Sequence, residues 1–232
     1  MKITVINGTP QKGVTCKMKE RFLDSFRKDS EITEFYPDAF PEFCTGCKNC
    51  FLQGEEKCPH FSKTAIVWES MMRSDIIVFA YPVYALRAPA GIKSLLDHLC
   101  VHWMTHRPEP AFFKKKAVII TNSIGAPNRA AQKDVATSLN WLGISLVSIC
   151  GIPLMGDIFV DSMSEKHRRM IDEKMEKLAD RVKSRNGGTH MSVKVWMFFQ
   201  MAKLQHKMVL NSEEVPGLDS AHYLKHGWIR RF

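Results

Sequence analysis

Residues 75–89 read DIIVFAYPVYALRAP, and this stretch decides the fold. Its first seven residues are the strongest strand signal in the chain, because a short apolar run bounded by turn residues is typical of a buried strand. The loop over residues 82–89 begins and ends with proline, and residues 90–104 have the pattern of a helix. The stretch therefore predicts a strand, a loop and a helix in succession, which is the unit that α/β folds repeat.

The same unit recurs on both sides of this stretch. We expect strands at residues 2–8, 31–36, 75–81, 116–122 and 144–151. We expect helices at residues 16–28, 64–74, 90–104, 129–142 and 164–185. Five strands that alternate with helices predict an α/β fold with a doubly wound parallel sheet, because crossovers between parallel strands are right-handed. The Asn-Gly-Gly run at 186–188 marks a boundary, so we predict one domain over residues 1–186 and a helical extension over residues 187–232.

The extension is both apolar and basic. Residues 192–210 predict a helix with a large apolar face, and residues 183–232 contain eight Lys or Arg and three Asp or Glu. We expect the apolar face to pack on its own domain or on a second subunit, and association with a membrane surface is the lesser alternative. A basic surface can attract nucleic acid, an anionic membrane or an acidic protein, but a solvated surface is the simpler interpretation, and we expect no nucleic-acid partner.

Composition and cysteine placement narrow the class of protein. The chain has 232 residues, of which 45% are hydrophobic, so it can bury a sizeable core. It shows no apolar leader and no run of about 18 apolar residues that would cross a membrane. Four of its seven cysteines lie between residues 44 and 58, which indicates reduced thiols, metal binding or redox chemistry rather than structural disulfides. We therefore expect a cytoplasmic protein.

Three loops follow predicted strands, at residues 9–15, 82–89 and 122–128. In doubly wound sheets the ligand binds outside the carboxyl ends of the strands, at the topological switch point. Residues 7–16, NGTPQKGVTC, join a strand to a helix, so free N–H groups and threonine hydroxyls there suit a phosphate monoester. The stretch matches neither the P-loop nor the dinucleotide-binding pattern, and an ordinary capped turn is the alternative.

Four cysteines form the sharpest chemical motif, Cys-x2-Cys-x2-Cys-x7-Cys-Pro, at positions Cys44, Cys47, Cys50 and Cys58. Thiolates at this spacing can hold a single [4Fe–4S] cluster. Zinc is the lesser alternative, because its cysteine ligands usually come in well-separated pairs. Three histidines, His98, His102 and His106, share a helical spacing of four residues, and we expect them on a helix surface or at a subunit contact rather than at a metal site.

Together these motifs resemble a known family. GTPQKGVT (8–15), CTGCKNC (44–50) and YPVYALRAPAGIKSLLDHL (81–99) resemble the NADPH-dependent FMN reductase family of flavodoxin-like proteins, and the cysteines resemble its iron–sulfur flavoprotein branch. The resemblance covers about residues 1–180 and implies a flavodoxin-like five-stranded sheet of order 2-1-3-4-5. It also implies FMN as cofactor, NAD(P)H as donor and a [4Fe–4S] cluster, although related reductases keep a similar segment without a cluster.

The resemblance also implies which residues bind FMN. In the first loop, the FMN phosphate would lie against Thr9, Gln11, Val14, Thr15 and Cys16. The family's commoner loop is longer by one residue and has Arg where Gln11 stands and Asn where Val14 stands. Lys12 can substitute for the missing charge, so we expect weaker or slower FMN binding and not loss of the site. The flavin ring needs a stacking surface and backbone hydrogen bonds, which we assign to Pro82, Val83, Tyr84, Ala85, Asn122, Ser123 and Gly125.

These expectations combine into an FMN-dependent oxidoreductase. NAD(P)H would reduce the flavin, and electrons would pass, directly or through a cluster, to a quinone, a flavin or a protein. No catalytic side chain is expected, because the flavin carries the chemistry. The alternative is a non-catalytic electron carrier or a thiol redox sensor. The resemblance further implies a homodimer or homotetramer and, with a cluster, a ferredoxin-like electron partner.

Overall fold

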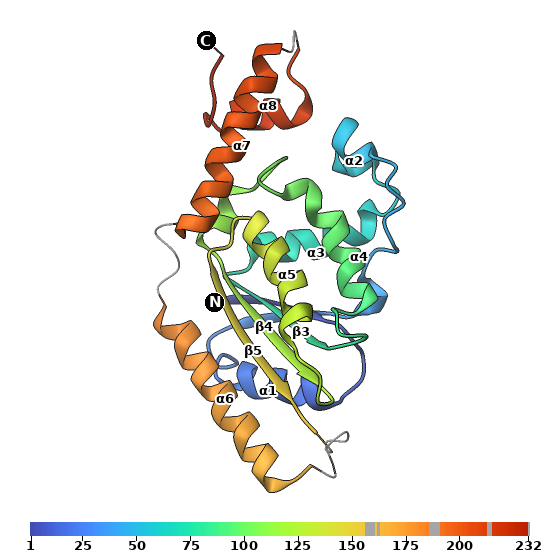
Figure 1. The fold of residues 1–232 in the computed structure, drawn as a ribbon, viewed down its shortest axis with the longest axis vertical. Helices are drawn as coiled ribbons and strands as arrows, with labels where there is room; N and C mark the ends of the chain where they lie inside the picture. Colours follow the sequence, from blue (N-terminus) through green and yellow to red (C-terminus); the bar gives the residue numbers. More distant parts are fainter. Residues whose placement is uncertain (156–160, 162, 186–190, 213–214, 232) are drawn as a thin grey trace.

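The computed structural model describes residues 1–155, 161, 163–185, 191–212 and 215–231. Within these residues one parallel sheet has the strand order β2-β1-β3-β4-β5, which confirms the predicted flavodoxin-like topology (Figure 1). The strands are β1 (Lys2–Asn7), β2 (Glu31–Phe35), β3 (Ile76–Pro82), β4 (Lys116–Ser123) and β5 (Leu146–Pro153). Because β1 leads outward to β2 while β3 leads the other way to β4, the topological switch point lies between β1 and β3.

Helices cover both faces of the sheet. One face carries α1 (Val14–Asp24) and α6 (Glu165–Ser184), and the other carries α3 (Phe61–Arg73), α4 (Ala90–Leu99) and α5 (Arg129–Trp141). Each face has its own apolar core, in which Met18 and Met175 meet the sheet on one side and Val67 and Val135 on the other. The central strand β3 is buried on both faces, and this explains why its sequence is continuously apolar rather than alternating.

Several predicted boundaries differ from the structure. The helix predicted over residues 90–104 ends at Leu99, because the chain tightens into a 3₁₀ turn at Cys100–His102 and then becomes extended. The predicted stripe of His98, His102 and His106 therefore does not form. Helix α1 begins and ends earlier than predicted, and β5 begins two residues later, after Gly143 turns the chain with φ of +105°. The short helices α2 (Asn49–Leu52) and α8 (Leu218–Lys225) were not expected, since so few turns give no clear period.

The C-terminal helices project beyond one end of the sheet (Figure 1). Helices α7 (Val193–Ser212) and α8 build a third apolar cluster, in which Phe198 stacks on Trp141 and the Tyr223 hydroxyl donates to the Met104 carbonyl of the preceding domain. The extension thus packs on its own domain, one of the two packings expected for its apolar face. The predicted domain boundary at residue 186 lies outside the described residues. In the part of the chain that the structure describes, no helix is long and apolar enough to cross a membrane.

Candidate functional site

Three loops meet at the carboxyl edge of the sheet, after β1, β3 and β4. The Gly8 N–H donates to the Ala80 carbonyl at 2.8 Å, and the Val83 N–H donates to the Asn122 carbonyl at 2.8 Å. Glycine is required at the first of these crossings, because a Cβ on Gly8 would lie 2.4 Å from the Cβ of Tyr81. Backbone hydrogen bonds therefore fix the three loops relative to one another.

The first loop lines a cavity of about 450 Å³, called here the first-loop cavity. Of the residues predicted from this loop, those that line the cavity are Thr9, Gln11, Lys12, Thr15 and Cys16. Val14 instead buries its side chain in the core, so only its backbone can reach a ligand. Tyr36 and Asp38, which follow β2, also line the cavity. The cavity thus combines hydroxyl, amide and ammonium donors at the start of a helix.

The amino end of α1 gives this cavity an anion-binding character. The helix begins at Val14, and its N-cap residue is Gly13, which has no side chain to cap the first turn. The first N–H groups of a helix have no partner within it, and the first turn of α1 holds no acidic residue. Together with the helix dipole, these N–H groups favour an anion at this position.

A buried ion-pair network lies behind the first loop. The Lys19 ammonium is 2.6 Å from a carboxylate oxygen of both Glu20 and Glu34, and the Asn7 amide donates to Glu34 at 2.9 Å. Burial lowers the pKa of Lys19, but hydrogen bonds to Glu20 and Glu34 raise it above its ordinary value. Burial likewise raises the pKa of Glu34, but hydrogen bonds from Lys19 and Asn7 hold it below its ordinary value. The charged network ties α1 to β1 and β2.

The second loop contains a strained tight turn. Ala85 and Leu86 have φ values of +48° and +63°, a region that residues other than glycine seldom occupy. Tyr84 and Arg87 exchange two backbone hydrogen bonds across the turn, of 3.1 and 2.9 Å. The Arg87 guanidinium pairs with Asp134 of α5, and this pair holds the turn in place. The turn exposes Tyr84 and Leu86 at the carboxyl edge, and backbone strain of this kind clusters at functional sites.

The third loop closes on itself. The Ser123 hydroxyl donates to the Ala126 carbonyl and accepts a 3.1 Å hydrogen bond from Asn128, while Gly125 adopts φ of +75°. The Asn122 amide donates to a backbone carbonyl of β5 at 3.1 Å. Ligand contacts from this loop would therefore come from its backbone. The residues predicted from the second and third loops do not line the first-loop cavity, and the Val83–Asn122 hydrogen bond joins these two loops to each other at the same edge of the sheet.

A second cavity, of about 360 Å³, collects the four cysteines of the motif. In this cysteine cavity, Cys44, Cys47, Cys50 and Cys58 face the ends of α3 and α4. Burial, and then the neighbouring cysteines, raise the pKa of the Cys50 thiol. Among the described residues, no three Cys, His, Asp or Glu side chains stand close enough together to hold a metal ion. Soft thiols around one cavity nevertheless suit an iron–sulfur cluster as a donor set.

The comparisons with known proteins place this geometry in a family. The family model described as NADPH-dependent FMN reductase matches residues 1–150. The chain belongs to this family.

Two relatives of this FMN reductase family member are named iron–sulfur flavoproteins. One, from Archaeoglobus fulgidus, is 28% identical over 138 residues, which cover 56% of this chain and 59% of the relative. The other, from Methanosarcina thermophila, is 26% identical over 167 residues, which cover 65% of this chain and 78% of the relative. The matched segment thus spans less than two thirds of the Archaeoglobus protein.

Solved structures of similar fold include two reductases. An azoreductase from Bacillus anthracis superposes with a TM-score of 0.61 at 17% identity, over 80% of this chain and 100% of that one. An NAD(P)H:quinone oxidoreductase from Methanothermobacter marburgensis superposes with a TM-score of 0.59 at 15% identity, over 80% of this chain and 98% of that one. At these identities the likeness concerns the fold alone.

Three histidines of this FMN reductase family member, His60, His98 and His102, line the cysteine cavity and were not predicted there. His98 and His102 are each 7% exposed, rather than lying on a helix surface. The His98 Nδ1 lies 2.9 Å from the Ser94 carbonyl, and the His102 ring stacks on Trp68 at 3.8 Å. Burial lowers the pKa of His102 to about 4, and Glu55 offsets this only in part. The sequence alone does not predict that His98 and His102 are buried, because their positions depend on where α4 ends.

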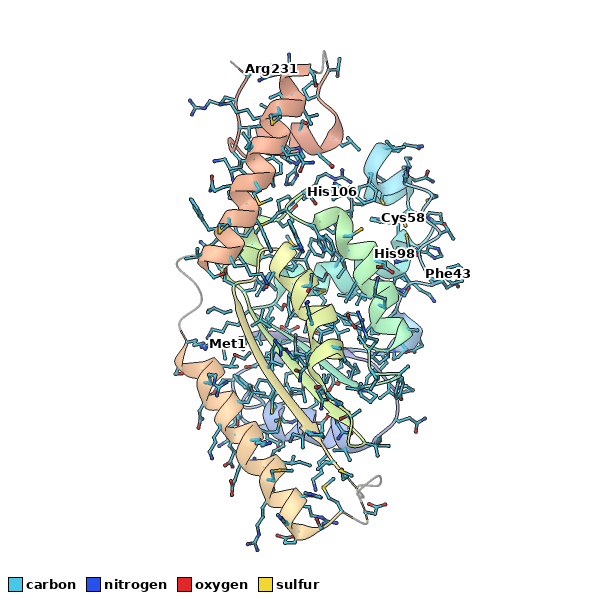
Figure 2. The ribbon with its side chains drawn as sticks, in the orientation of Figure 1. Met1, Phe43, Cys58, His98, His106 and Arg231 are labelled. Carbon is cyan, nitrogen blue, oxygen red and sulfur yellow. The ribbon has the colours of Figure 1, made fainter. Side chains whose placement is uncertain are left out.

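Arg107 joins the cysteine segment to the C-terminal extension. Its buried guanidinium donates to Glu55 at 3.0 Å, to the Cys50 carbonyl, and to Asp219 of α8. His106 Nδ1 lies 2.7 Å from Asp219 as well, and it is positioned between Cys58 and the C-terminal helices (Figure 2). No sequence pattern predicts Arg107 or Lys19 as buried, since each depends on partners far along the chain.

Proposed function

We propose that this protein is an FMN-dependent oxidoreductase that takes electrons from NAD(P)H and passes them to a quinone, a flavin or a protein. The observation that carries the proposal is the carboxyl edge of the sheet, where backbone hydrogen bonds join the loops after β1, β3 and β4, so that the first-loop cavity and the exposed turn bearing Tyr84 lie at the same edge. A polar cavity beside an apolar turn suits a ligand with a phosphate at one end and a flat ring at the other. The family match supports FMN as that ligand.

The first loop is proposed to hold the FMN phosphate. Thr9, Gln11, Lys12, Thr15 and Cys16 line its cavity, and Val14 offers a backbone N–H from the amino end of α1. These groups are hydrogen-bond donors or carry positive charge, as an ionised phosphate requires. Glu20 and Asp38 line the same cavity and oppose the phosphate electrostatically. Their presence supports weaker FMN binding than in loops that carry an arginine.

The second and third loops are proposed to hold the flavin ring. Tyr84 presents an exposed aromatic side chain for stacking, while Pro82, Val83 and Ala85 shape the backbone beneath it. Asn122, Ser123 and Gly125 would contact the ring's polar edge through backbone groups, because the Asn122 and Ser123 side chains bond to neighbouring carbonyls and Gly125 has no side chain. FMN held there would supply the hydride-accepting and electron-donating chemistry between the nicotinamide and the acceptor. The chain's own residues bind and orient it.

A [4Fe–4S] cluster is proposed for the cysteine cavity, held by Cys44, Cys47, Cys50 and Cys58. All four thiols line one cavity, and both named relatives are iron–sulfur flavoproteins. A cluster there would supply one-electron transfer, which suits a ferredoxin-like partner. The two proposed sites lie at opposite ends of α4, whose ten residues span roughly 15 Å. We further propose a cytoplasmic homodimer or homotetramer.

Anaerobic purification followed by an absorbance spectrum and an assay of iron and acid-labile sulfide tests both cofactors. We expect flavin peaks, with about four irons and four sulfides per chain. Flavin without iron, after attempted reconstitution, would remove the cluster and leave the flavoenzyme. Absence of flavin after reconstitution with FMN would contradict the proposal as a whole.

A second candidate function is a thiol redox sensor or electron carrier without turnover. It is favoured by Cys44 and Cys47, whose exposure allows thiol exchange with a partner. Steady consumption of NADH or NADPH in the presence of a quinone or free flavin separates the two functions. An enzyme sustains many turnovers per chain, whereas a carrier or sensor stops after one round of reduction.

A further inference from the structure

Helix α7 has apolar side chains on two opposite faces. The inner face packs on the domain through buried residues that include Val195, Phe199 and Ala202. The opposite face carries an outer stripe whose five members are Val193, Met197, Met201, Leu204 and Met208. The spacing of four, four, three and four residues places them on one line along the helix. Each is between 52% and 76% exposed, so the outer stripe has no cover in the described structure.

Basic residues border the outer stripe. At 100° per residue, Lys194 and Lys207 flank it on opposite sides, and Trp196 is exposed beside it. A cavity of about 580 Å³ next to Leu204 is lined by four cationic side chains, and these define the basic cavity: Lys203, Lys207, Arg230 and Arg231. Arg231 lies at the tip of the molecule, beyond the sheet (Figure 2). An apolar stripe therefore adjoins a concentrated positive charge.

The charge of α7 distinguishes between the partners that such a stripe can take. The helix contains three lysines and neither aspartate nor glutamate. If the outer stripe packed on the same stripe of a second copy, the lysines of one α7 would be brought near those of the other, and neither helix itself holds an acidic residue. A surface of anionic lipid headgroups is complementary instead, because it accepts apolar side chains and attracts the lysines and arginines that border them.

We propose that α7 docks this protein on the surface of a membrane that contains anionic lipids. The helix lies in the plane of the interface, with the outer stripe among the headgroups and the basic cavity facing lipid phosphates. Trp196 suits this boundary, because its ring is apolar and its N–H remains near water. The docking is peripheral, in keeping with the absence from the described residues of any helix able to span a membrane. The sequence pattern predicts that α7 packs on its own domain or on a second subunit. The outer stripe can be recognised only once the structure shows which apolar residues of α7 are buried.

Sedimentation with vesicles tests the proposal on the full-length protein. We expect binding to vesicles of mixed phosphatidylglycerol and phosphatidylcholine, no binding to phosphatidylcholine alone, and weaker binding as salt is raised. The stripe variant Met197→Ser/Met201→Ser/Leu204→Ser should bind at least roughly tenfold more weakly. The basic variant Lys203→Gln/Lys207→Gln should lose roughly ten- to thirtyfold, since each cation near an anionic surface contributes about 1 kcal/mol.

Matched variants elsewhere on the surface serve as controls. Ile66→Ser removes an exposed apolar side chain from α3, and Lys174→Gln/Lys177→Gln removes two exposed lysines from α6. Both should keep wild-type binding, and circular dichroism spectra and FMN content should be unchanged in every variant. Equal binding to neutral vesicles, or anionic binding that survives in the stripe and basic variants, would overturn the proposal. A dimer that the stripe variant converts to monomers, with no vesicle binding, would assign the outer stripe to a second copy instead.

Discussion

The carboxyl edge of the sheet and the cysteine cavity are held together in different ways. At the edge, backbone hydrogen bonds such as Gly8 to Ala80 join loops that leave neighbouring strands. At the cavity, one side chain, Arg107, gathers the Cys50 carbonyl, Glu55 and a residue of α8. The geometry of the edge is therefore set by backbone hydrogen bonds of the fold. The geometry of the cysteine cavity depends instead on a few ion pairs and on the group that its thiols bind. The two sites should accordingly respond independently to mutation.

The largest effect is expected from Cys50→Ser. The variant should lose the iron of the proposed cluster while keeping its FMN, because the two proposed sites lie at opposite ends of α4. Iron, sulfide and flavin are measured per chain after anaerobic reconstitution. Cys150→Ser, a half-buried cysteine of β5 outside the motif, should change neither. If Cys50→Ser leaves the iron content unchanged, or if flavin is lost together with the iron, then the carboxyl edge and the cysteine cavity are not independent sites of the proposed kind.

Gly8→Ala should damage the carboxyl edge. The added Cβ would lie 2.4 Å from the Cβ of Tyr81, so β1 and β3 must separate locally. We expect a loss of about 2–3 kcal/mol in the free energy of unfolding, measured on the apoprotein by circular dichroism, and weaker FMN binding. Gly91→Ala is the control, because its Cβ would make only ordinary contacts with Phe40 and it should be neutral or stabilising by up to about 1 kcal/mol. Wild-type stability in Gly8→Ala would mean that the loops are not fixed at this crossing.

Arg107→Ala should act on the cysteine cavity and on its link to α8, and not on the carboxyl edge. It leaves Glu55 and Asp219 half-buried without their main cation, at a cost of about 2 kcal/mol after allowance for their partial exposure. Iron should leave the variant faster under a chelator, whereas its dissociation constant for FMN should stay within about twofold of wild type. Arg21→Ala, which breaks surface ion pairs with Asp172 and Glu176 of α6, should cost less than about 1 kcal/mol. Equal effects of Arg107→Ala on iron and FMN would contradict the separation of the sites.

The smallest effect concerns pH and the network behind the first loop. Since the folded-state pKa of Glu34 lies below its ordinary value of 4.5, the carboxylate contributes stability above pH 4.5 that is lost as the pH falls through its folded pKa. In Glu34→Gln, the apoprotein should be less stable near neutral pH and should lose less stability on acidification. Urea unfolding at a series of pH values measures both, with Glu31→Gln, solvent-exposed on the same strand, as control. Identical slopes in wild type and Glu34→Gln would exclude this role.

The sheet and its loops could be predicted because their signals are local. The apolar runs at 2–8, 75–81 and 116–122 announce buried strands, and right-handed crossovers then restrict the order of the sheet. The same argument predicts that the loop over residues 9–15 lines a ligand site, since ligands bind where parallel strands end. The identity of the ligand did not follow from spacing and came from the family resemblance.

The cysteine cavity could be predicted only in part. The four cysteines are visible as a motif, but the wall formed by His98 and His102 depends on α4 ending at Leu99, and a 3₁₀ turn leaves no periodic signal. The Arg107–Asp219 ion pair joins residues 112 positions apart, so no local pattern reveals it. Side-chain contacts between distant segments are therefore the part of this site that could not be predicted from the sequence.

The most direct test of the flavin site compares FMN with riboflavin, which lacks the phosphate. Fluorescence titration of the apoprotein should give one FMN per chain and an affinity roughly a hundredfold greater than that for riboflavin, since the first loop acts on the phosphate. In Lys12→Gln/Thr15→Val this preference should shrink toward unity, through loss of FMN affinity with riboflavin affinity unchanged. Equal affinities of the wild-type protein for FMN and riboflavin, or a double variant that keeps the full preference, would contradict the account.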